Sequence, residues 1–205
     1  MSRSRTPRAP SPVRVLRLLP HDPDRARRRR AVRDPAAERA APAAGHAGRP
    51  IEIPAWSTGH TRRAVGTRKL AYVDSGFACH LLVQDLRRLG EPDGAAGPMV
   101  ENFVLMELAR QLTWSDERAL LYHYRTKDKT EVDAVLETVD GRVVGVEVKA
   151  GSTVRAEDLA GLRHLAERVG PWFVAGYVLY TGQQTLPFGH RLRALPIDAL
   201  WRMAP

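Results

Sequence analysis

Asp133, Glu147 and Lys149 stand among valines in the stretch TEVDAVLETVDGRVVGVEVKA, which covers residues 130–150. Side chains of a half-buried strand alternate between two faces, so Asp133 is predicted to share a face with Val135. The same alternation places Glu147 and Lys149 together on one face of the following strand. A carboxylate directed toward a core is costly unless it has a partner, so charged residues among valines need an explanation. The stretch therefore predicts that the two acids and the lysine converge.

The elements that must position these residues follow from the pattern of apolar and turn residues. Asp140-Gly141 is a strong signal for a tight type I′ turn between two strands. A strand over 120–124 precedes this hairpin, and a helix over 156–169, ended by a Gly-Pro pair, follows it. The apolar run WFVAGYVLYTG then predicts a buried strand. This order predicts an α/β fold with a mixed central sheet flanked by helices.

The stretch PMVENFVLMELARQL, residues 98–112, is predicted to be a helix with one apolar stripe. The stripe consists of Val100, Val104, Leu105, Leu108 and Leu112. Glu101 lies inside it, where a carboxylate needs a partner such as a metal ion, a lysine or the helix N-terminus. Because Glu101 is predicted to fall in the first turn, the helix dipole is one explanation and a functional site is the other. Glu107 lies at the edge of the stripe and is predicted to be an exposed acid.

Charge is distributed unevenly along the chain. Residues 1–66 hold 15 of the 32 basic residues and 5 of the 23 acidic residues, a net charge of +10. The remaining 17 basic and 18 acidic residues give residues 67–205 a net charge of −1. The run from Arg27 to Arg30 is either a phosphate-binding arm or a solvated leader. The high sequence pI therefore belongs to the N-terminal third.

Composition divides the chain into three parts. Residues 1–50 are a low-complexity Arg, Pro and Ala-rich segment with few aromatic side chains, which predicts a disordered basic tail. Residues 51–98 are predicted to form a linker with a small helical and strand segment. Residues 99–205 are predicted to form the main domain.

Several classes of protein and site are disfavoured by what the sequence lacks. Cys79 is the single cysteine, which excludes an intramolecular disulfide and predicts a cytoplasmic protein. No stretch approaches the roughly 18 apolar residues of a membrane span, so no membrane partner is expected. The seven histidines show no paired zinc-ligand spacing, and no GxxxxGK[ST] phosphate-binding loop occurs. Nucleotide hydrolysis is therefore not encoded in this chain.

The order of a helix acid, a strand acid and a Glu-x-Lys strand resembles the PD-(D/E)xK nucleases of the restriction-endonuclease-like fold. More closely, the chain is similar to the C-terminal domain of unknown function 4143 (DUF4143), which follows an AAA-type ATPase domain in prokaryotic ATP-binding proteins. Five segments carry this similarity: SGFACHLL, ENFVLMEL, YHYRTKDKTEVDAVLE, VVGVEVKAGSTV and GYVLYTGQQTLPFGHRLRALPIDALW. The similarity runs from about Pro54 to the end of the chain. It implies a restriction-endonuclease-like mixed sheet.

The resemblance also implies a catalytic site. Asp133 and Glu147, with the backbone carbonyl of Val148, would bind Mg²⁺ or Mn²⁺. Lys149 would position the attacking water and stabilise the charge that develops on the phosphate. Glu101 would supply an additional carboxylate from the helix. The residue before Asp133 is valine, where the family motif has proline.

Three further basic residues precede the predicted strand acid: Arg125, Lys127 and Lys129. They are either contacts to a nucleic-acid backbone or ordinary turn residues. The resemblance implies nucleic acid and an AAA-type ATPase domain or subunit as partners. Three hypotheses follow: a metal-dependent nuclease, a catalytically inactive nucleic-acid or protein interaction module of an ATPase complex, and a set of ion pairs on a solvated sheet face.

Overall fold

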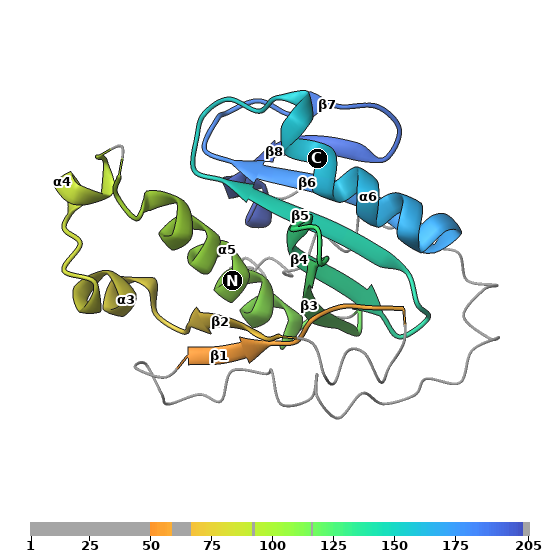
Figure 1. The fold of residues 1–205 in the computed structure, drawn as a ribbon, viewed down its shortest axis with the longest axis horizontal. Coiled ribbons are helices and arrows are strands. Elements are labelled where there is room, and N and C mark those ends of the chain that lie inside the picture. The colour runs from red at the N-terminus through yellow and green to blue at the C-terminus, as the bar shows by residue number, and fades with distance from the viewer. Residues whose placement is uncertain (1–49, 59–66, 92, 116, 203–205) are drawn as a thin grey trace, which may run out of the picture.

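The computed structural model describes residues 50–58, 67–91, 93–115 and 117–202. The predicted N-terminal tail lies outside these residues, apart from Pro50. The elements labelled in Figure 1 are, in chain order, β1 (Pro50–Ile53), β2 (Lys69–Tyr72), α3 (Ser75–Leu81), α4 (Leu86–Leu89), α5 (Ala96–Leu112), β3 (Ala119–Arg125), β4 (Glu131–Thr138), β5 (Val143–Lys149), the 3-10 turn η1 (Ala156–Leu159), α6 (Ala160–Val169), η2 (Gly170–Trp172), β6 (Phe173–Tyr180), β7 (Leu186–Pro187), β8 (Leu192–Pro196) and η3 (Ile197–Leu200).

Six strands form one mixed sheet in the order β3-β4-β5-β6-β8-β7. The strands β3, β4 and β5 are antiparallel neighbours, whereas β5, β6 and β8 run parallel. Parallel neighbours need a crossover connection, and α6 provides it between β5 and β6. Helices α5 and α6 lie on opposite faces of the sheet (Figure 1). The predicted mixed central sheet flanked by helices is confirmed.

Each face of the sheet has its own hydrophobic core. Under α5 the core contains Val104, Leu105, Val144, Val146 and Val148. Under α6 it contains Val143, Leu159, Leu162, Leu165 and Phe173. Val144, Val146 and Val148 therefore share the face toward α5, as the sequence predicts, and Val143 packs on the other face.

Helix α5 buries the predicted stripe. Val104, Leu105 and Leu108 are buried, and Val100 and Leu112 pack against the same core. The helix begins at Ala96, however, so Glu101 lies in its second turn and the first turn contains no acid. The expectation that Glu101 benefits from a first-turn position is therefore wrong, and this carboxylate needs another partner.

Glu107 is also placed differently from its prediction. Its side chain is buried and accepts hydrogen bonds from Gln111 Nε2 at 2.9 Å and Trp201 Nε1 at 3.0 Å. Gln111 Nε2 also donates to the Leu200 carbonyl at 3.1 Å, so η3 covers this side of α5. The predicted exposure of Glu107 is wrong because residues almost a hundred positions later in the chain close over it.

The connection between β4 and β5 is longer than predicted. Residues 139–142 separate the strands, and the Thr138 N–H donates to the Arg142 carbonyl at 2.9 Å. Asp140 accepts from Arg142 Nε at 2.7 Å and from the Thr138 hydroxyl. Gly141 has a φ of +87°. The two-residue type I′ turn is therefore wrong, because these side-chain bonds stabilise a four-residue turn around the same Asp-Gly pair.

Strand β4 contains a β-bulge. Tyr122 of β3 pairs with Val135, but Tyr124 pairs with Val132, so β4 has one residue more than β3 in this interval. The residues in the interval are Asp133 and Ala134 on β4 and His123 on β3. Bulges occur next to functional sites because they redirect a side chain. The bulge between β3 and β4 lies at the predicted strand acid.

The strands β1 and β2 form a separate two-stranded ribbon beside α5 (Figure 1). Ile53 and Ala71 from the ribbon enter the core under α5. Asn102 of α5 fixes the end of β2, because its side chain accepts from the Tyr72 N–H at 2.7 Å and donates to the Tyr72 carbonyl at 2.9 Å. The position of the ribbon relative to α5 is thus set by both packing and hydrogen bonds.

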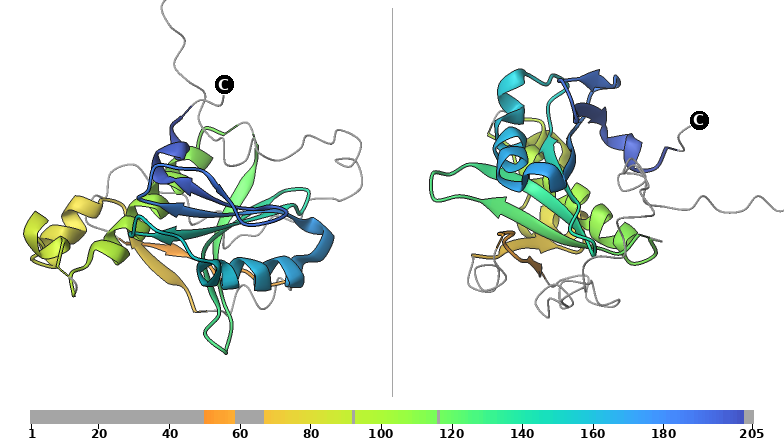
Figure 2. Two further views of the ribbon diagram at one scale, coloured as in Figure 1. Left: turned by 90° about the horizontal axis from the view of Figure 1, so that it is seen from above. Right: turned by 90° about the vertical axis from the view of Figure 1, so that its right-hand side faces the viewer.

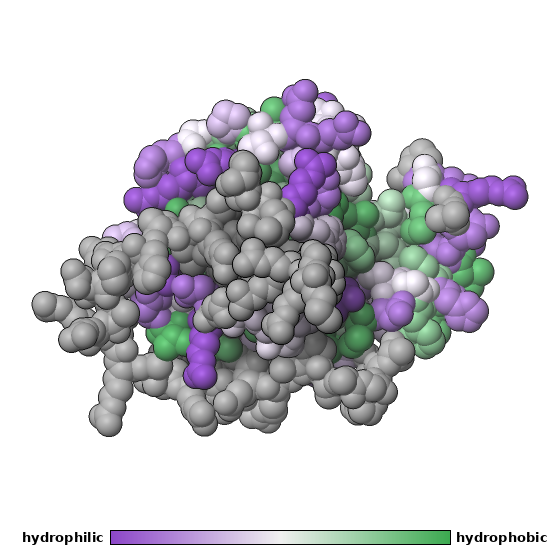
Figure 3. Space-filling view, turned by 180° about the vertical axis from the view of Figure 1, so that it is seen from behind, coloured by the Kyte–Doolittle hydropathy of each residue, from purple (hydrophilic) through white to green (hydrophobic). Residues whose placement is uncertain are grey.

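The short helices α3 and α4 project from the end of the molecule (Figure 2). Leu81 at the end of α3 and Leu82 and Val83 in the connection to α4 are exposed, and Val83 has a φ of +52°. Hydrophobic side chains on this projecting segment are visible at the right of Figure 3. Within the described residues, no helix is both long enough and apolar enough to span a membrane.

Candidate functional site

The bulge directs Asp133 toward the side of the sheet that faces α5. Val132 and Val135 both pack in the core under α6, whereas Ala134 and Leu136 pack in the core under α5. Asp133 contacts Lys69 of the β1–β2 ribbon, which also packs on the α5 side. The predicted face shared by Asp133 and Val135 is therefore wrong, because the extra residue interrupts the alternation of β4.

Lys69 lies between two of the predicted catalytic carboxylates. Its Nζ atom forms an ion pair with Glu101 Oε1 and a second ion pair, at 3.0 Å, with Asp133 Oδ1. The three side chains come from β2, α5 and β4, and each is at least two-thirds buried, with exposed fractions of 25%, 28% and 12%. Of the partners considered for Glu101, the structure supplies a lysine.

Burial and charge together set the protonation of this group. Burial alone would lower the pKa of Lys69, but the negative charges of Asp133 and Glu101 outweigh it and raise the pKa. Burial also raises the pKa of Glu101, and the negative charge of Asp133 adds to this effect while Lys69 opposes it. The lysine is therefore held in its charged form between the two acids.

Glu147 is the third carboxylate, and it is the least compensated. The register of β4 and β5 pairs Ala134 with Val146, so the bulge residue Asp133 is the next neighbour of Glu147 across the strands. Burial, followed by the negative charge of Asp133, raises the pKa of Glu147 to about 8. Its Oε2 atom is buried and has no hydrogen-bond partner among the described residues. We call Lys69, Glu101, Asp133 and Glu147 the carboxylate cluster.

Val148 links Asp133 to β5 through its backbone. The Val148 N–H donates to Asp133 Oδ2 at 2.9 Å. In an extended strand the N–H and C=O of one residue point toward the same neighbouring strand. The Val148 carbonyl, the predicted backbone ligand, therefore faces the β4 side, where the Asp133 carboxylate lies.

Lys149 does not form an ion pair with the carboxylate cluster. Its Nζ atom pairs with Asp158 Oδ1 of η1 at 3.2 Å, and its side chain is 38% exposed. The positive charge of Lys149 nevertheless lowers the pKa of Glu147, against the larger effects of burial and Asp133. The structure therefore joins Glu101 and Asp133 through Lys69 and places Glu147 next to Asp133 across the strands, whereas Lys149 is bonded to Asp158.

The predicted nucleic-acid residues lie at the turn between β3 and β4. Arg125 is exposed and pairs with Glu131 at 2.9 Å. Lys127 and Lys129 are exposed, and Lys129 has a φ of +62°. These side chains are accessible to a phosphate backbone, but one of their three positive charges is already paired within the hairpin.

The donor set of the cluster fits a hard divalent cation. Among the described residues, no three His, Cys, Asp or Glu side chains are grouped closely enough to hold a metal ion by themselves. Mg²⁺, however, keeps several waters and usually takes only one or two protein carboxylates. Asp133, Glu147 and the Val148 carbonyl meet that requirement, and the unpartnered Glu147 Oε2 is a buried oxygen that such a cation would satisfy.

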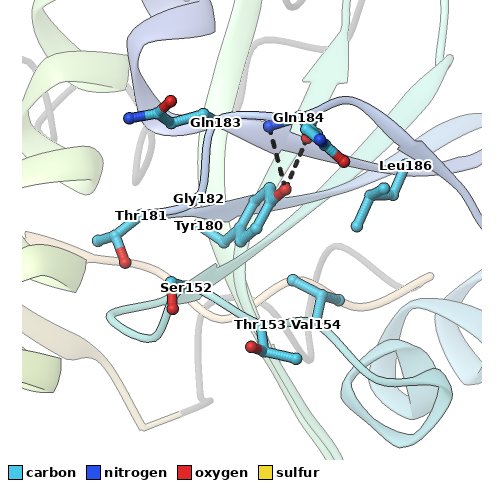
Figure 4. A pocket seen from close by; sticks show the side chains of 9 residues that line it. All are labelled: Ser152, Thr153, Val154, Tyr180, Thr181, Gly182, Gln183, Gln184 and Leu186. Atoms are coloured by element: carbon cyan, nitrogen blue, oxygen red, sulfur yellow. Dashed lines mark hydrogen bonds between the residues drawn. The ribbon is translucent and has the colours of Figure 1, made fainter.

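A hollow of about 480 Å³ lies at the carboxyl ends of β5 and β6, the usual place for a ligand in a sheet with parallel strands. Figure 4 shows its lining from residues 152–154 and from residues 180–184 and 186, with the Tyr180 hydroxyl donating to the Gln184 carbonyl at 2.7 Å. No lining residue is charged, and none belongs to the predicted site. Hydroxyl and amide groups there can bind a polar group, and no side chain of the lining supplies a positive charge.

Two residues of this region were missed from the sequence. Lys69 is 32 residues before Glu101 and 64 before Asp133, so spacing gave no signal for it. Asp158 lies within the helix predicted over 156–169, and its position in the first turn after a Glu-x-Lys strand is only a weak signal of a role at the site. Both contribute charges that compensate predicted catalytic residues.

The comparison with protein families identifies the region that contains this site. A model described as domain of unknown function (DUF4143) matches residues 96–200, from the start of α5 to the end of η3. No curated protein and no solved structure matches the chain. The match includes every predicted catalytic and metal-binding residue, whereas Lys69 precedes it. Because the matched region is slightly more than half of the 205 residues, the chain belongs to the DUF4143 family.

Proposed function

We propose that this protein is a metal-dependent phosphodiester hydrolase of the PD-(D/E)xK type, with a restriction-endonuclease-like domain and nucleic acid as its substrate class. The observation that carries the proposal is Glu147. A buried carboxylate oxygen without a partner is costly unless a cation or proton satisfies it. This oxygen lies on a Glu-x-Lys strand, next to a second carboxylate that a bulge has redirected. Such an arrangement is typical of a site that binds a cation.

Each residue of the site would have a different role in the reaction. Asp133, Glu147 and the Val148 carbonyl would hold Mg²⁺ or Mn²⁺, which would lower the pKa of a bound water and polarise the phosphate. Lys149 would leave Asp158 and donate to the attacking water or to a phosphate oxygen, as its partial exposure allows. Glu101 would stabilise the arrangement from α5. Arg125, Lys127 and Lys129 would contact the backbone of the nucleic acid.

A second function has its own supporting observation. Lys69 pairs with both Glu101 and Asp133, and Asp158 pairs with Lys149, so part of the charge of the region is compensated without a metal ion. The alternative is a catalytically inactive nucleic-acid or protein interaction module. In either case we propose an AAA-type ATPase domain or subunit as a partner, which rests on the resemblance alone.

Calorimetric titration with Mn²⁺ tests the first function against the second. The comparison is between the parent and Asp133→Asn/Glu147→Gln, which preserves side-chain size while removing both ligand charges. The matched control is Asp128→Asn/Glu157→Gln, which removes two exposed carboxylates of the same types. We expect saturable binding in the parent and the control and at least a tenfold loss of affinity in the site variant.

Cleavage of labelled DNA and RNA with Mg²⁺ or Mn²⁺ then tests catalysis. We expect Lys149→Ala to lower the rate by about 10² to 10⁴, the range for a positioned acid, base or electrostatic group. Undiminished cleavage by a Lys149→Ala/Asp133→Ala variant would assign the activity to other residues. Metal binding that is equal in the parent and the site variant, or absent from both, would leave the interaction module as the function.

A further inference from the structure

The β1–β2 ribbon lies outside the family match but contributes a charge to the carboxylate cluster. Lys69 is the first residue of β2, and the matched region begins at Ala96. In the register of the ribbon, Lys69 pairs with Ile53. Ala71, two residues further and on the same face as Lys69, is buried in the core under α5. The alternation of β2 therefore aims the lysine toward the site.

The ribbon holds the ammonium group in a defined place. The Asn102 side chain brackets the backbone of Tyr72 with two hydrogen bonds, and Asn102 directly follows Glu101 on α5. Packing of Ile53 fixes the other strand of the ribbon. Strand β2 is thus tied to α5 by hydrogen bonds next to Glu101. The distance between Lys69 and its two acids therefore does not depend on a long loop.

The ammonium group uses the same oxygen atoms that a cation would use. Lys69 Nζ forms ion pairs with Glu101 Oε1 and Asp133 Oδ1, and the Val148 N–H donates a hydrogen bond to Asp133 Oδ2. A divalent ion that binds Asp133 must therefore compete with a positive charge already bonded to that carboxylate. Without Lys69, two part-buried acids would face each other, and no other positive group among the described residues is bonded to either.

We propose that Lys69 is the internal counter-cation of the site: it assembles Glu101 and Asp133 before a metal ion is present and competes with that ion for Asp133. Its role in assembling the acids is independent of the proposed function, whereas the competition rests on it. Lys69 is a positioning residue, since it acts through the two carboxylates. It also makes the metal affinity of the site depend on the β1–β2 ribbon.

Two measurements on the full chain test this inference, with Lys69→Met as the main variant and Lys69→Arg as the conservative one. Arg68→Met is the matched control, because it removes one positive charge from the adjacent position, where Arg68 pairs with the exposed Glu52. Each protein is titrated with Mn²⁺ alone.

We expect Lys69→Met to bind Mn²⁺ at least tenfold more tightly than the parent. Arg68→Met should differ from the parent by less than threefold, and Lys69→Arg should remain near the parent. A structural defect would weaken binding, so a gain of affinity identifies competition.

Urea unfolding in the presence of EDTA tests the assembly without any metal ion. We expect Lys69→Met to lower the midpoint, Asp133→Asn to lower it as well, and the double variant to lower it by clearly less than the sum. Additive effects would overturn the counter-cation role, and equal Mn²⁺ affinities of the parent and Lys69→Met would overturn the competition. Absence of Mn²⁺ binding from the parent and from Lys69→Met would instead overturn the proposed metal site and the competition together, while the urea cycle would still decide the assembly role.

Discussion

At the scale of single residues, Glu147 has the most strongly shifted pKa of the carboxylate cluster. Its folded-state pKa of about 8 is above the ordinary value of 4.5, so the folded protein holds a proton that the unfolded chain releases between these pH values. The contribution of Glu147 to the free energy of unfolding should therefore be highest below about pH 4.5. It should fall as the pH rises toward 8 and stay constant above that pH. The buried carboxyl group is thus a cost to folding at neutral and alkaline pH.

Glu147→Gln should remove this cost. We expect the variant to be more stable than the parent by on the order of 2 kcal/mol at pH 8, and the difference to shrink toward zero near pH 4. Urea unfolding across pH 4–9 without added metal measures the difference, with Glu157→Gln as a control that removes an exposed carboxylate. A difference that is independent of pH would show that Glu147 is ionised in the folded protein, contrary to the burial described above.

The identities of the site residues were more predictable than their partners. The residue types and order around Asp133 and Glu147 pointed to the acids, because carboxylates among valines are unusual in a strand. The lysine that bonds Asp133 and Glu101 was not predictable, since Lys69 and Asp133 are 64 positions apart in the sequence and meet only when the chain folds back. The predicted exposure of Glu107 was wrong for the same reason, because its tryptophan partner is 94 residues away in the sequence.

At the scale of elements, the contact of α6 with the sheet depends on a glycine. A Cβ atom at Gly161 would lie 2.0 Å from the Glu131 carbonyl oxygen, which belongs to the backbone of β4 and cannot move aside cheaply. Gly97 of α5 occupies the corresponding second position of its helix, and a Cβ atom there would meet nothing within 4 Å. The two glycines thus form a matched pair that differs only in surroundings.

Gly161→Ala should destabilise the protein by about 2 kcal/mol or more, because α6 must shift away from the strand that carries Asp133. Gly97→Ala should be neutral or stabilising by about 0.5–1 kcal/mol, the gain expected for alanine over glycine in a helix. Thermal or urea unfolding of both variants checks the contrast. Equal effects of the two substitutions would mean that α6 does not approach β4 as closely as described.

The elements themselves were largely predictable, and the irregular features between them were not. The alternating valines of β5 and the apolar stripe of α5 both pack in the core between the helix and the sheet. Each pattern can therefore be recognised within a short stretch of sequence. The bulge at Asp133 depends on how β4 pairs with β3, and a local window of β4 contains no information on that register. The Asp-Gly turn was located correctly, but its length depends on the bonds of Thr138 and Arg142.

At the scale of the whole molecule, charge is divided between two parts of the chain. Residues 1–66 carry a net charge of +10 and residues 67–205 a net charge of −1. Electrostatic affinity for nucleic acid follows the number of phosphates that positive side chains neutralise. The turn lysines Lys127 and Lys129 lie close in sequence to Asp128 and Glu131, which offset part of their charge, whereas the run from Arg27 to Arg30 contains no acid.

If nucleic acid is the partner, the Arg-rich segment should therefore contribute more to its affinity than the turn. We expect Arg28→Gln/Arg29→Gln to reduce the slope of log Kd against log salt concentration by about 2, since each phosphate contact contributes about 0.9. Lys127→Gln/Lys129→Gln removes the same charge and should reduce the slope by about 1. Fluorescence anisotropy with labelled single-stranded and duplex DNA between 50 and 300 mM salt measures both slopes. Binding that does not weaken with salt in the parent would exclude phosphate contacts, and a larger effect of the turn variant would place the contact surface at the β3–β4 hairpin beside the carboxylate cluster.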